Sequence, residues 1–131
     1  MRILAIDDEI LLTFTIERKL SLNQYVVKTA NSGAEGIRLF DQFDPQLVIL
    51  DYNMPGLNGL DVLKHIRFQR KSNVPVLLLS GTQDERQLTN SFQVGITSFL
   101  GKPLDFNELL AKVKEIAEEN PGIGPTNMAA G

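Results

Sequence analysis

The sequence predicts an α/β domain built on a doubly wound parallel sheet, with helices on both faces. Short runs rich in leucine, isoleucine and valine alternate along the chain with longer segments whose apolar residues recur at helical spacing. Some of the short runs contain no polar residue, which is typical of strands buried on both faces of a parallel sheet. Five strands that alternate with five helices imply βαβ units joined by right-handed crossovers.

The clearest strand is Leu47–Leu50, four apolar residues that end at Asp51. The stretch 53–56, Asn-Met-Pro-Gly, prevents the strand from continuing. An aspartate at the carboxyl end of a buried strand lies where open α/β sheets bind their ligands. The other expected strands are Ile3–Ile6, Tyr25–Ala30, Val76–Leu79 and Thr97–Leu100.

The helices are expected between these strands, each with an apolar stripe toward the sheet. The first follows Asp7, Asp8 and Glu9, and either aspartate can cap it. Its inward stripe is Leu12, Thr15, Ile16 and Leu20. The second helix is expected to carry Ala34 to Phe40, and the third to run from Leu60 to about Arg70. The fourth is expected from Asp84 to Val94, with Leu88, Phe92 and Val94 as its anchors in the core. The last is expected from Asp105 to about Asn120.

The chain has 131 residues, the size of one domain with a single core. We expect this domain to cover residues 1–120. Residues 121–131 have few apolar side chains and are expected to form a flexible tail or linker. No apolar run approaches the roughly 18 residues that a membrane span needs, and the start lacks a signal-peptide pattern, so a cytoplasmic location is the default expectation.

The composition excludes several classes of function. The chain has no cysteine, which rules out disulfides, thiolate metal sites and a cysteine nucleophile. Thirteen basic and sixteen acidic residues give a net charge of −3, which argues against a broad surface for nucleic acid or membranes.

Polar side chains follow four of the five strands at the same edge of the predicted sheet. Asp7 and Asp8 follow the first strand, Asp51 the third, Ser80 the fourth and Lys102 the fifth. Carboxylates that converge in this way repel one another, and a divalent cation relieves the repulsion. Oxygen ligands favour Mg²⁺. The lysine and the hydroxyl add an anion site beside the metal, and the natural anion is a phosphoryl group on Asp51.

These residues, in this order and spacing, resemble the receiver domain of two-component response regulators from about Arg2 to Glu119. The resemblance rests on Asp7-Asp8, on Leu47–Gly59 with Asp51, Asn53, Met54-Pro55 and Gly59, and on Ser80, Phe99 and Lys102-Pro103. It implies a flavodoxin-like (βα)5 fold with strand order 2-1-3-4-5. It also implies a phosphoacceptor that catalyses its own phosphoryl transfer and dephosphorylation and has no separate substrate.

The resemblance assigns the site residues. Asp51 would accept phosphoryl from a sensor histidine kinase or a histidine phosphotransfer protein. Asp8, Asp51 and the backbone carbonyl of Asn53 would bind Mg²⁺, and Asp7 would act through a bound water. Lys102 would bind the phosphoryl oxygens.

The resemblance also implies a switch. Ser80 would bind the phosphoryl group, and Phe99 would turn inward when Ser80 moves, which would change the surface of the fourth helix, the fifth strand and the last helix. Two positions depart from the family pattern: Gly81 replaces the usual alanine, and Leu104 replaces a frequent phenylalanine. Neither change affects the chemistry.

Residues next to the acidic edge of the sheet are candidates for contact with a partner. The first helix carries an apolar face of Ile10, Leu11 and Phe14 beside the acidic edge, and we expect docking of the phosphoryl donor on Leu11, Phe14, Thr15 and Leu104. The output is expected on a downstream protein or domain, with the chain a monomer or a phosphorylation-dependent dimer, and without direct binding of nucleic acid or membrane. We also expect the Lys102-Pro103 bond to be cis, because a lysine aimed back at the site needs a sharp reversal of the chain.

Simpler interpretations exist for each residue. Asp7 and Asp8 would then be helix caps, Ser80 a turn residue, Lys102 a solvated lysine and Phe99 plain core. His65, the only histidine, lies beside Lys64 in a helix and is expected to be exposed and inert.

Two other function classes share part of this pattern. A phosphatase of the haloacid dehalogenase type uses an aspartyl-phosphate but has a second aspartate two residues after the nucleophile, where this chain has Asn53. A receiver-like module that binds partners without phosphorylation is opposed by the complete set Asp8, Asp51, Ser80 and Lys102.

Overall fold

The computed structural model describes residues 1–81 and 85–120. They form a five-stranded parallel sheet with the order β2-β1-β3-β4-β5, which confirms the predicted fold class and strand order. The expected helix start at Asp84 and the expected tail 121–131 lie outside the described residues. None of the helices in the described ranges has the length and apolar character needed to cross a membrane.

All five expected strands are present, with ends that differ by at most one residue from the expectation. They are β1 (Arg2–Ile6), β2 (Val26–Ala30), β3 (Leu47–Asp51), β4 (Val76–Ser80) and β5 (Ser98–Gly101). Tyr25, expected as the first residue of the second strand, lies just before it and is buried.

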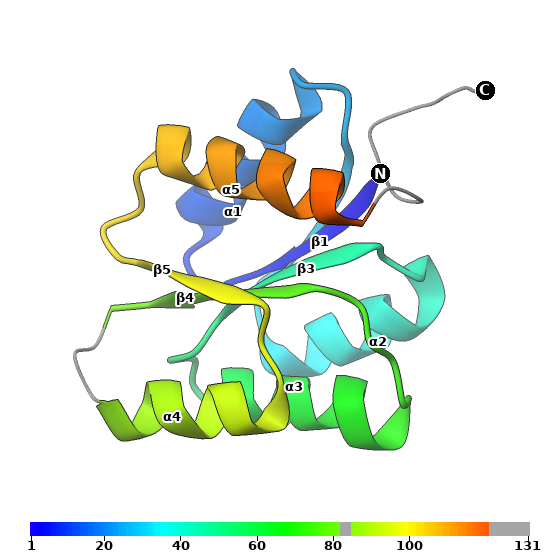
Figure 1. Ribbon diagram of the computed structural model, residues 1–131, viewed down its shortest axis with the longest axis vertical. Coiled ribbons are helices and arrows are strands. Elements are labelled where there is room, and N and C mark those ends of the chain that lie inside the picture. Colours follow the sequence, from blue (N-terminus) through cyan, green and yellow to red (C-terminus); the bar gives the residue numbers. More distant parts are fainter. Residues whose placement is uncertain (82–84, 121–131) are drawn as a thin grey trace.

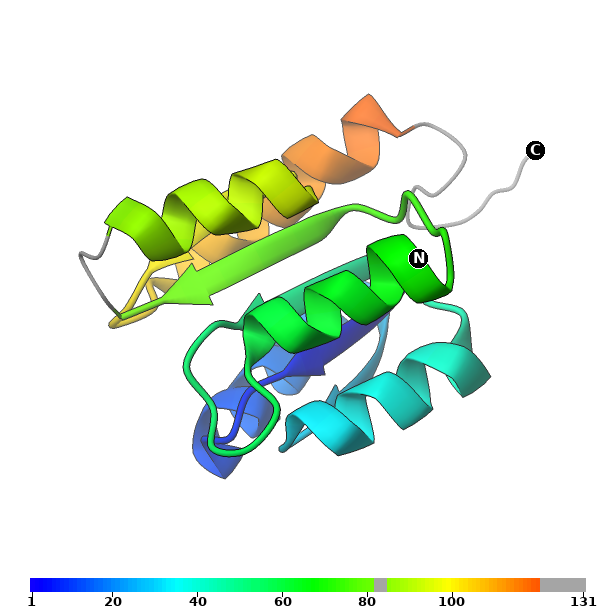
Figure 2. The same cartoon turned by 90° about the horizontal axis from the view of Figure 1, so that it is seen from below.

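The helices cover both faces of the sheet (Figure 1). They are α1 (Ile10–Ser21), α2 (Gly33–Phe43), α3 (Gly59–Lys64), α4 (Glu85–Val94) and α5 (Phe106–Glu119), with a π-helical segment η1 (His65–Gln69) after α3. α1 and α5 lie on one face, and α2, α3 and α4 lie side by side on the other (Figures 1 and 2).

The central strands have apolar residues on both sides because both sides are buried. On the α1 and α5 side, Ile3, Ile49 and Leu77 pack with Ile16 and Val113. The alternate strand residues pack in the second core with α2 and α3; they are Leu4, Ile6, Val48, Leu50, Val76 and Leu78. This double burial explains the uninterrupted apolar runs in the sequence.

The helix starts differ partly from expectation. Asp7 and Asp8 do not cap α1: the N-cap residue is Glu9, which makes no side-chain cap bond. Asp7 Oδ1 instead accepts a hydrogen bond from the backbone N–H of Glu9 at 2.9 Å. At α5, which was expected from Asp105, Asp105 is the N-cap and accepts hydrogen bonds from two backbone N–H groups of the first turn.

His65 is not exposed and inert, contrary to the expectation. Its side chain is only 12% exposed, and its Nε2 lies 3.2 Å from Asp41 Oδ1 on α2. The ring also packs edge-on against Phe40. The chain changes here from an α-helix to a π-helix, with a hydrogen bond from the N–H of Arg70 to the carbonyl of His65. The expectation rested on the charged neighbour Lys64, but His65 lies three residues after the buried Val62, beside it on the helix surface.

Phe92 is not a core anchor of α4, since 49% of it is exposed. It packs edge-on against Phe99, with ring centroids 6.0 Å apart. The other two expected anchors, Leu88 and Val94, are partly buried against the core. The helix is therefore held to the sheet by fewer apolar contacts than its neighbours.

Gly59 fixes the path of the chain after β3. A Cβ atom at this position would lie 2.4 Å from the carbonyl oxygen of Asp51 and 2.7 Å from Cα of Tyr52. Only glycine permits so close an approach of two backbone segments. The start of α3 is thereby held directly against the end of β3, where Asp51 lies.

Candidate functional site

The polar residues expected at one edge of the sheet do lie at the carboxyl ends of its strands. Asp51 and Ser80 are the last residues of β3 and β4, Asp7 and Asp8 follow β1, and Lys102 follows β5. Asp7, Asp51 and Ser80 are at most 5% exposed. Burial of polar groups at this density needs compensation by charge or hydrogen bonds, so the edge is a candidate site.

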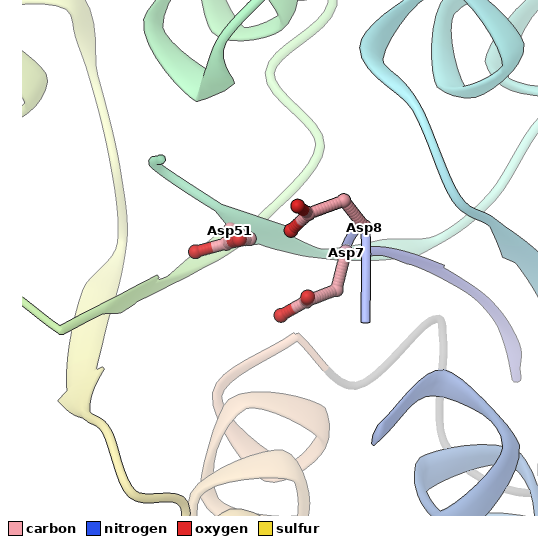
Figure 3. Close-up of side chains that lie close together, drawn as sticks. All are labelled: Asp7, Asp8 and Asp51. Atoms are coloured by element: carbon pink, nitrogen blue, oxygen red, sulfur yellow. The ribbon is translucent and has the colours of Figure 1, made fainter. Parts of the chain in front are cut away.

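Three carboxylates converge there. Figure 3 shows Asp7 and Asp8 beside Asp51, and one carboxylate oxygen from each lies within 4.8 Å of the others. Asp7 and Asp51 are buried, whereas Asp8 is exposed. The prediction that these side chains come together is therefore confirmed, and the interpretation of Asp7 and Asp8 as helix caps is wrong.

Lys102 supplies the opposite charge. Its Nζ lies 2.8 Å from Asp7 Oδ2, 3.5 Å from Asp51 Oδ2 and 2.7 Å from Glu9 Oε1. The side chain is only 17% exposed, so the interpretation of Lys102 as a solvated lysine is wrong. The Lys102-Pro103 bond is cis, as expected.

Glu9 was missed as a site residue. In the sequence it is the third acid of Asp7-Asp8-Glu9, and an acid before a helix is favoured by the helix dipole without any further role. The available signal was the position of Glu9 directly after the two aspartates, at the same strand end that Lys102 approaches from β5.

The charges in the site are not balanced. Burial, together with the charge of Asp7, raises the pKa of Asp51 to about 7, against the opposing effect of Lys102 and a backbone hydrogen bond from Asn53. Burial also raises the pKa of Asp7. Burial lowers the pKa of Lys102, but hydrogen bonds to Asp7 and Glu9 outweigh it and leave that pKa raised. One ammonium thus faces two buried carboxylates that both resist ionisation.

Ser80 and Phe99 border a hollow next to this cluster. The hollow has a volume of about 330 Å³ and is also lined by Gly81, Glu85, Leu88, Gly101 and Lys102. Ser80 is buried at the end of β4, where its carbonyl accepts a hydrogen bond from the N–H of Lys102. Phe99 is 41% exposed, so it is not plain core. The ring lies against Phe92, and Phe99 and Ser80 both line the hollow.

The expected docking residues differ in exposure. Leu11 is 80% and Phe14 is 53% exposed on α1, next to Ile10. Thr15 is half-buried, and its hydroxyl donates to the carbonyl of Leu11. Leu104 is half-buried against the core on the α1 and α5 side. The apolar face of α1 is therefore available to a partner at Leu11 and Phe14.

Comparison with known proteins identifies the family. Residues 3–114 match the model of the response regulator receiver domain. The chain belongs to this family. As a receiver domain it is a signalling module of two-component systems.

The receiver domain has relatives among curated regulators and solved structures. It is 32% identical over 122 residues to the cell cycle transcriptional regulator CtrA of Caulobacter vibrioides, with 93% of this chain and 52% of that protein covered. It is 36% identical over 115 residues to the CpxR homologue of Haemophilus influenzae, with 88% of this chain and 49% of that protein covered. The chain spans about half the length of these relatives. The chemotaxis protein CheY4 of Vibrio cholerae is similar in structure, with a TM-score of 0.82, 28% identity, and 88% of this chain and 97% of that chain covered.

The raised pKa of Asp51 predicts how stability depends on pH. The folded protein binds the proton on Asp51 more tightly than the unfolded chain does, so ionisation of Asp51 costs folding free energy as the pH rises from about 4 to 7, and the full cost remains above 7. In the presence of a chelator, we expect Asp51→Asn to raise the melting temperature at pH 8 by on the order of 5 °C and to have less effect at pH 5.

Thermal unfolding of both proteins at the two pH values measures this difference. Asp44→Asn is the matched control, because Asp44 has an exposed side chain and a left-handed backbone that asparagine accepts. If Asp51→Asn raised the melting temperature equally at pH 5 and pH 8, ionisation of Asp51 would not be the cause of the gain.

Proposed function

We propose that this receiver domain accepts a phosphoryl group on Asp51 from a phosphohistidine of a sensor histidine kinase or a histidine phosphotransfer protein. The observation that carries the proposal is the surroundings of Asp51: a buried carboxylate at the end of the central strand, with two further carboxylates and one ammonium beside it. A purely structural aspartate gains nothing from such repulsion.

The reaction needs no other nucleophile. A carboxylate oxygen of Asp51 forms a bond to phosphorus while the bond between phosphorus and the imidazole nitrogen of the donor breaks. The electron pair of the broken bond stays on that nitrogen, which takes up a proton. Asp51 must be ionised to attack, and its pKa of about 7 leaves it only partly ionised near neutral pH.

The site fits a hard divalent cation. Carboxylate oxygens from Asp7, Asp8 and Asp51 lie within 4.8 Å of one another, and Lys102 offers a single positive charge against them. Asp8, Asp51 and the backbone carbonyl of Asn53 would hold Mg²⁺, with Asp7 acting through a bound water. When bound, the ion supplies positive charge that favours the ionised carboxylates and screens the phosphoryl oxygens.

Lys102 and Ser80 are proposed to bind the transferred group. The Nζ of Lys102 is already 3.5 Å from Asp51 and carries a positive charge that the phosphoryl oxygens attract. Ser80 ends the neighbouring strand β4, which pairs with β3 through Leu79 and Asp51. Its hydroxyl is a suitable donor for a phosphoryl oxygen, and its movement toward Asp51 would start the response.

The response is proposed to pass through Phe99. A shift of Ser80 toward the phosphoryl group enlarges the hollow that both residues line, and the ring of Phe99 then turns into it. Phe99 would leave Phe92, so the surface of α4, β5 and α5 would change. A shift from mostly inactive to mostly active needs about 5.5 kcal/mol of differential binding, so partial activity in either state is expected.

The signal is proposed to reach a downstream protein or domain in the cytoplasm without direct contact of this chain with nucleic acid. A phosphorylation-independent binding module is the alternative. It assigns no role to the repulsion between Asp7 and Asp51, and the labelling experiment that follows separates the two.

Incubation with a small phosphodonor and Mg²⁺ should yield one acyl phosphate, on Asp51, labile to base and hydroxylamine. Peptide mapping by mass spectrometry locates it. Asp51→Asn should not be labelled, and Asp8→Ala should lose at least about a hundredfold in rate while its fold is kept. A stable phosphoserine, or normal labelling of Asp8→Ala, would overturn the assignment.

Docking predicts a difference between phosphoryl donors. Leu11→Arg should slow transfer from the cognate kinase by about tenfold or more, because an arginine disrupts an apolar contact, but should leave labelling by a small donor unchanged. Leu22→Arg is the matched control, since Leu22 is 78% exposed at the other end of α1. Equal slowing with both donors would show damage to the site instead of to docking.

The switch predicts where protection from hydrogen exchange changes. With beryllofluoride as the phosphoryl mimic, amides of α4, β5 and the exposed face of α5 should change their exchange rates, because Phe99 and Phe92 separate. β2 and α2 serve as the internal reference and should not change. A change confined to the loops around Asp51 would show that Phe99 takes no part.

A further inference from the structure

The nearest partner of Lys102 is a residue with no assigned role in the phosphoryl site. Nζ lies 2.7 Å from Glu9 Oε1, closer than to Asp7 at 2.8 Å or Asp51 at 3.5 Å. An ammonium has three N–H donors, and here three carboxylates surround it. Two of these contacts are short and the one to Asp51 is long, so a phosphoryl oxygen on Asp51 competes with Glu9 and Asp7 for the position of Lys102.

Glu9 is the contact that costs least to release. Asp7 is 1% exposed, and removal of its ammonium partner would leave a buried carboxylate unpaired. The side chain of Glu9 is 62% exposed, so water replaces Lys102 there at little cost. Asp51 is the residue that would carry the phosphoryl group, so Lys102 would move toward it.

The three distances also show on which side Lys102 rests. Both short contacts are to residues that follow β1, and the long one is to Asp51 at the end of β3. We propose that Glu9 is a positioning residue that holds Lys102 on the β1 side of the resting site and releases it when Asp51 is phosphorylated. That Glu9 holds Lys102 follows from the contact between them, whereas the release of Lys102 on phosphorylation rests on the proposed function. Glu9 thus opposes phosphorylation and sets its rate.

Substitution of Glu9 should leave the fold intact. Glu9 is the N-cap residue of α1 but makes no side-chain cap bond, and its side chain is exposed. Glu9→Gln removes the charge. Glu9→Asp keeps the charge but shortens the side chain by one methylene, and an aspartate at an N-cap bonds the first-turn N–H groups of its own helix. Glu119→Gln, at the exposed end of α5, is the control for net charge.

The first measurement needs neither metal nor phosphoryl group. In protein with ¹⁵N-labelled lysine, NMR gives the rate at which the ammonium protons of Lys102 exchange with water. Both Glu9 variants should exchange about two- to fivefold faster than the wild type, the factor that corresponds to loss of a partly exposed ion pair. Glu119→Gln should not differ. Unchanged exchange in both Glu9 variants would overturn the proposal.

The second measurement is the rate of labelling by phosphoramidate with Mg²⁺. Both Glu9 variants should be labelled about two- to fivefold faster, because Lys102 is free to reach the phosphoryl oxygens. Faster labelling of Glu9→Gln alone would show that the charge of Glu9 acts on the donor and would overturn its action through Lys102. If Asp51 is not labelled even in the wild type, the proposed function fails, and lysine exchange still decides whether Glu9 holds Lys102.

Discussion

The structure depends on one electrostatic constraint: two buried carboxylates share a single ammonium. Asp7 and Asp51 are almost fully buried, and Lys102 reaches both, at 2.8 and 3.5 Å. Burial of like charges costs free energy that the surrounding protein must offset. That cost explains why Asp51 has a pKa of about 7 and why the site favours any added positive charge. A group that relieves the repulsion is bound more tightly by this edge than by an ordinary surface.

The fold makes the constraint possible because it fixes the backbone on which the charges stand. β1, β3 and β4 are buried on both faces, so the ends of these strands cannot move apart to relieve the repulsion. Gly59 adds to this, since it lets α3 lie directly against the carbonyl of Asp51. The hollow beside Ser80 is different, because it borders α4, which has few apolar anchors. A rigid charged edge thus meets a softer helix, and this is where the proposed function places the conversion of a change of charge into a change of surface.

The sequence predicts the rigid part of the molecule well. Runs such as Leu47–Leu50 have only one compatible environment, and the order of the polar residues after the strands then follows from parallel pairing. Side chains whose environment depends on the path of a helix were less predictable. His65 was expected to be exposed, but it lies three residues after the buried Val62 and reaches Asp41 on α2. Phe92 was expected in the core but packs on Phe99, since a large ring satisfies an apolar pattern equally well on a half-covered surface.

Glu9 shows a further limit of sequence reasoning, and the reason is physical. A carboxylate directly before a helix is favoured by the helix dipole wherever it occurs, so the residue type alone does not reveal a second role. That role depends on Lys102, which lies 93 residues away in sequence and reaches Glu9 from another strand. The same contact connects the ion pairs of the resting site with the proposed binding of the phosphoryl group. In the proposed function, Lys102 neutralises buried carboxylates at rest and binds a phosphoryl group later, and the exposed Glu9 beside it would make the resting position favourable without making it permanent.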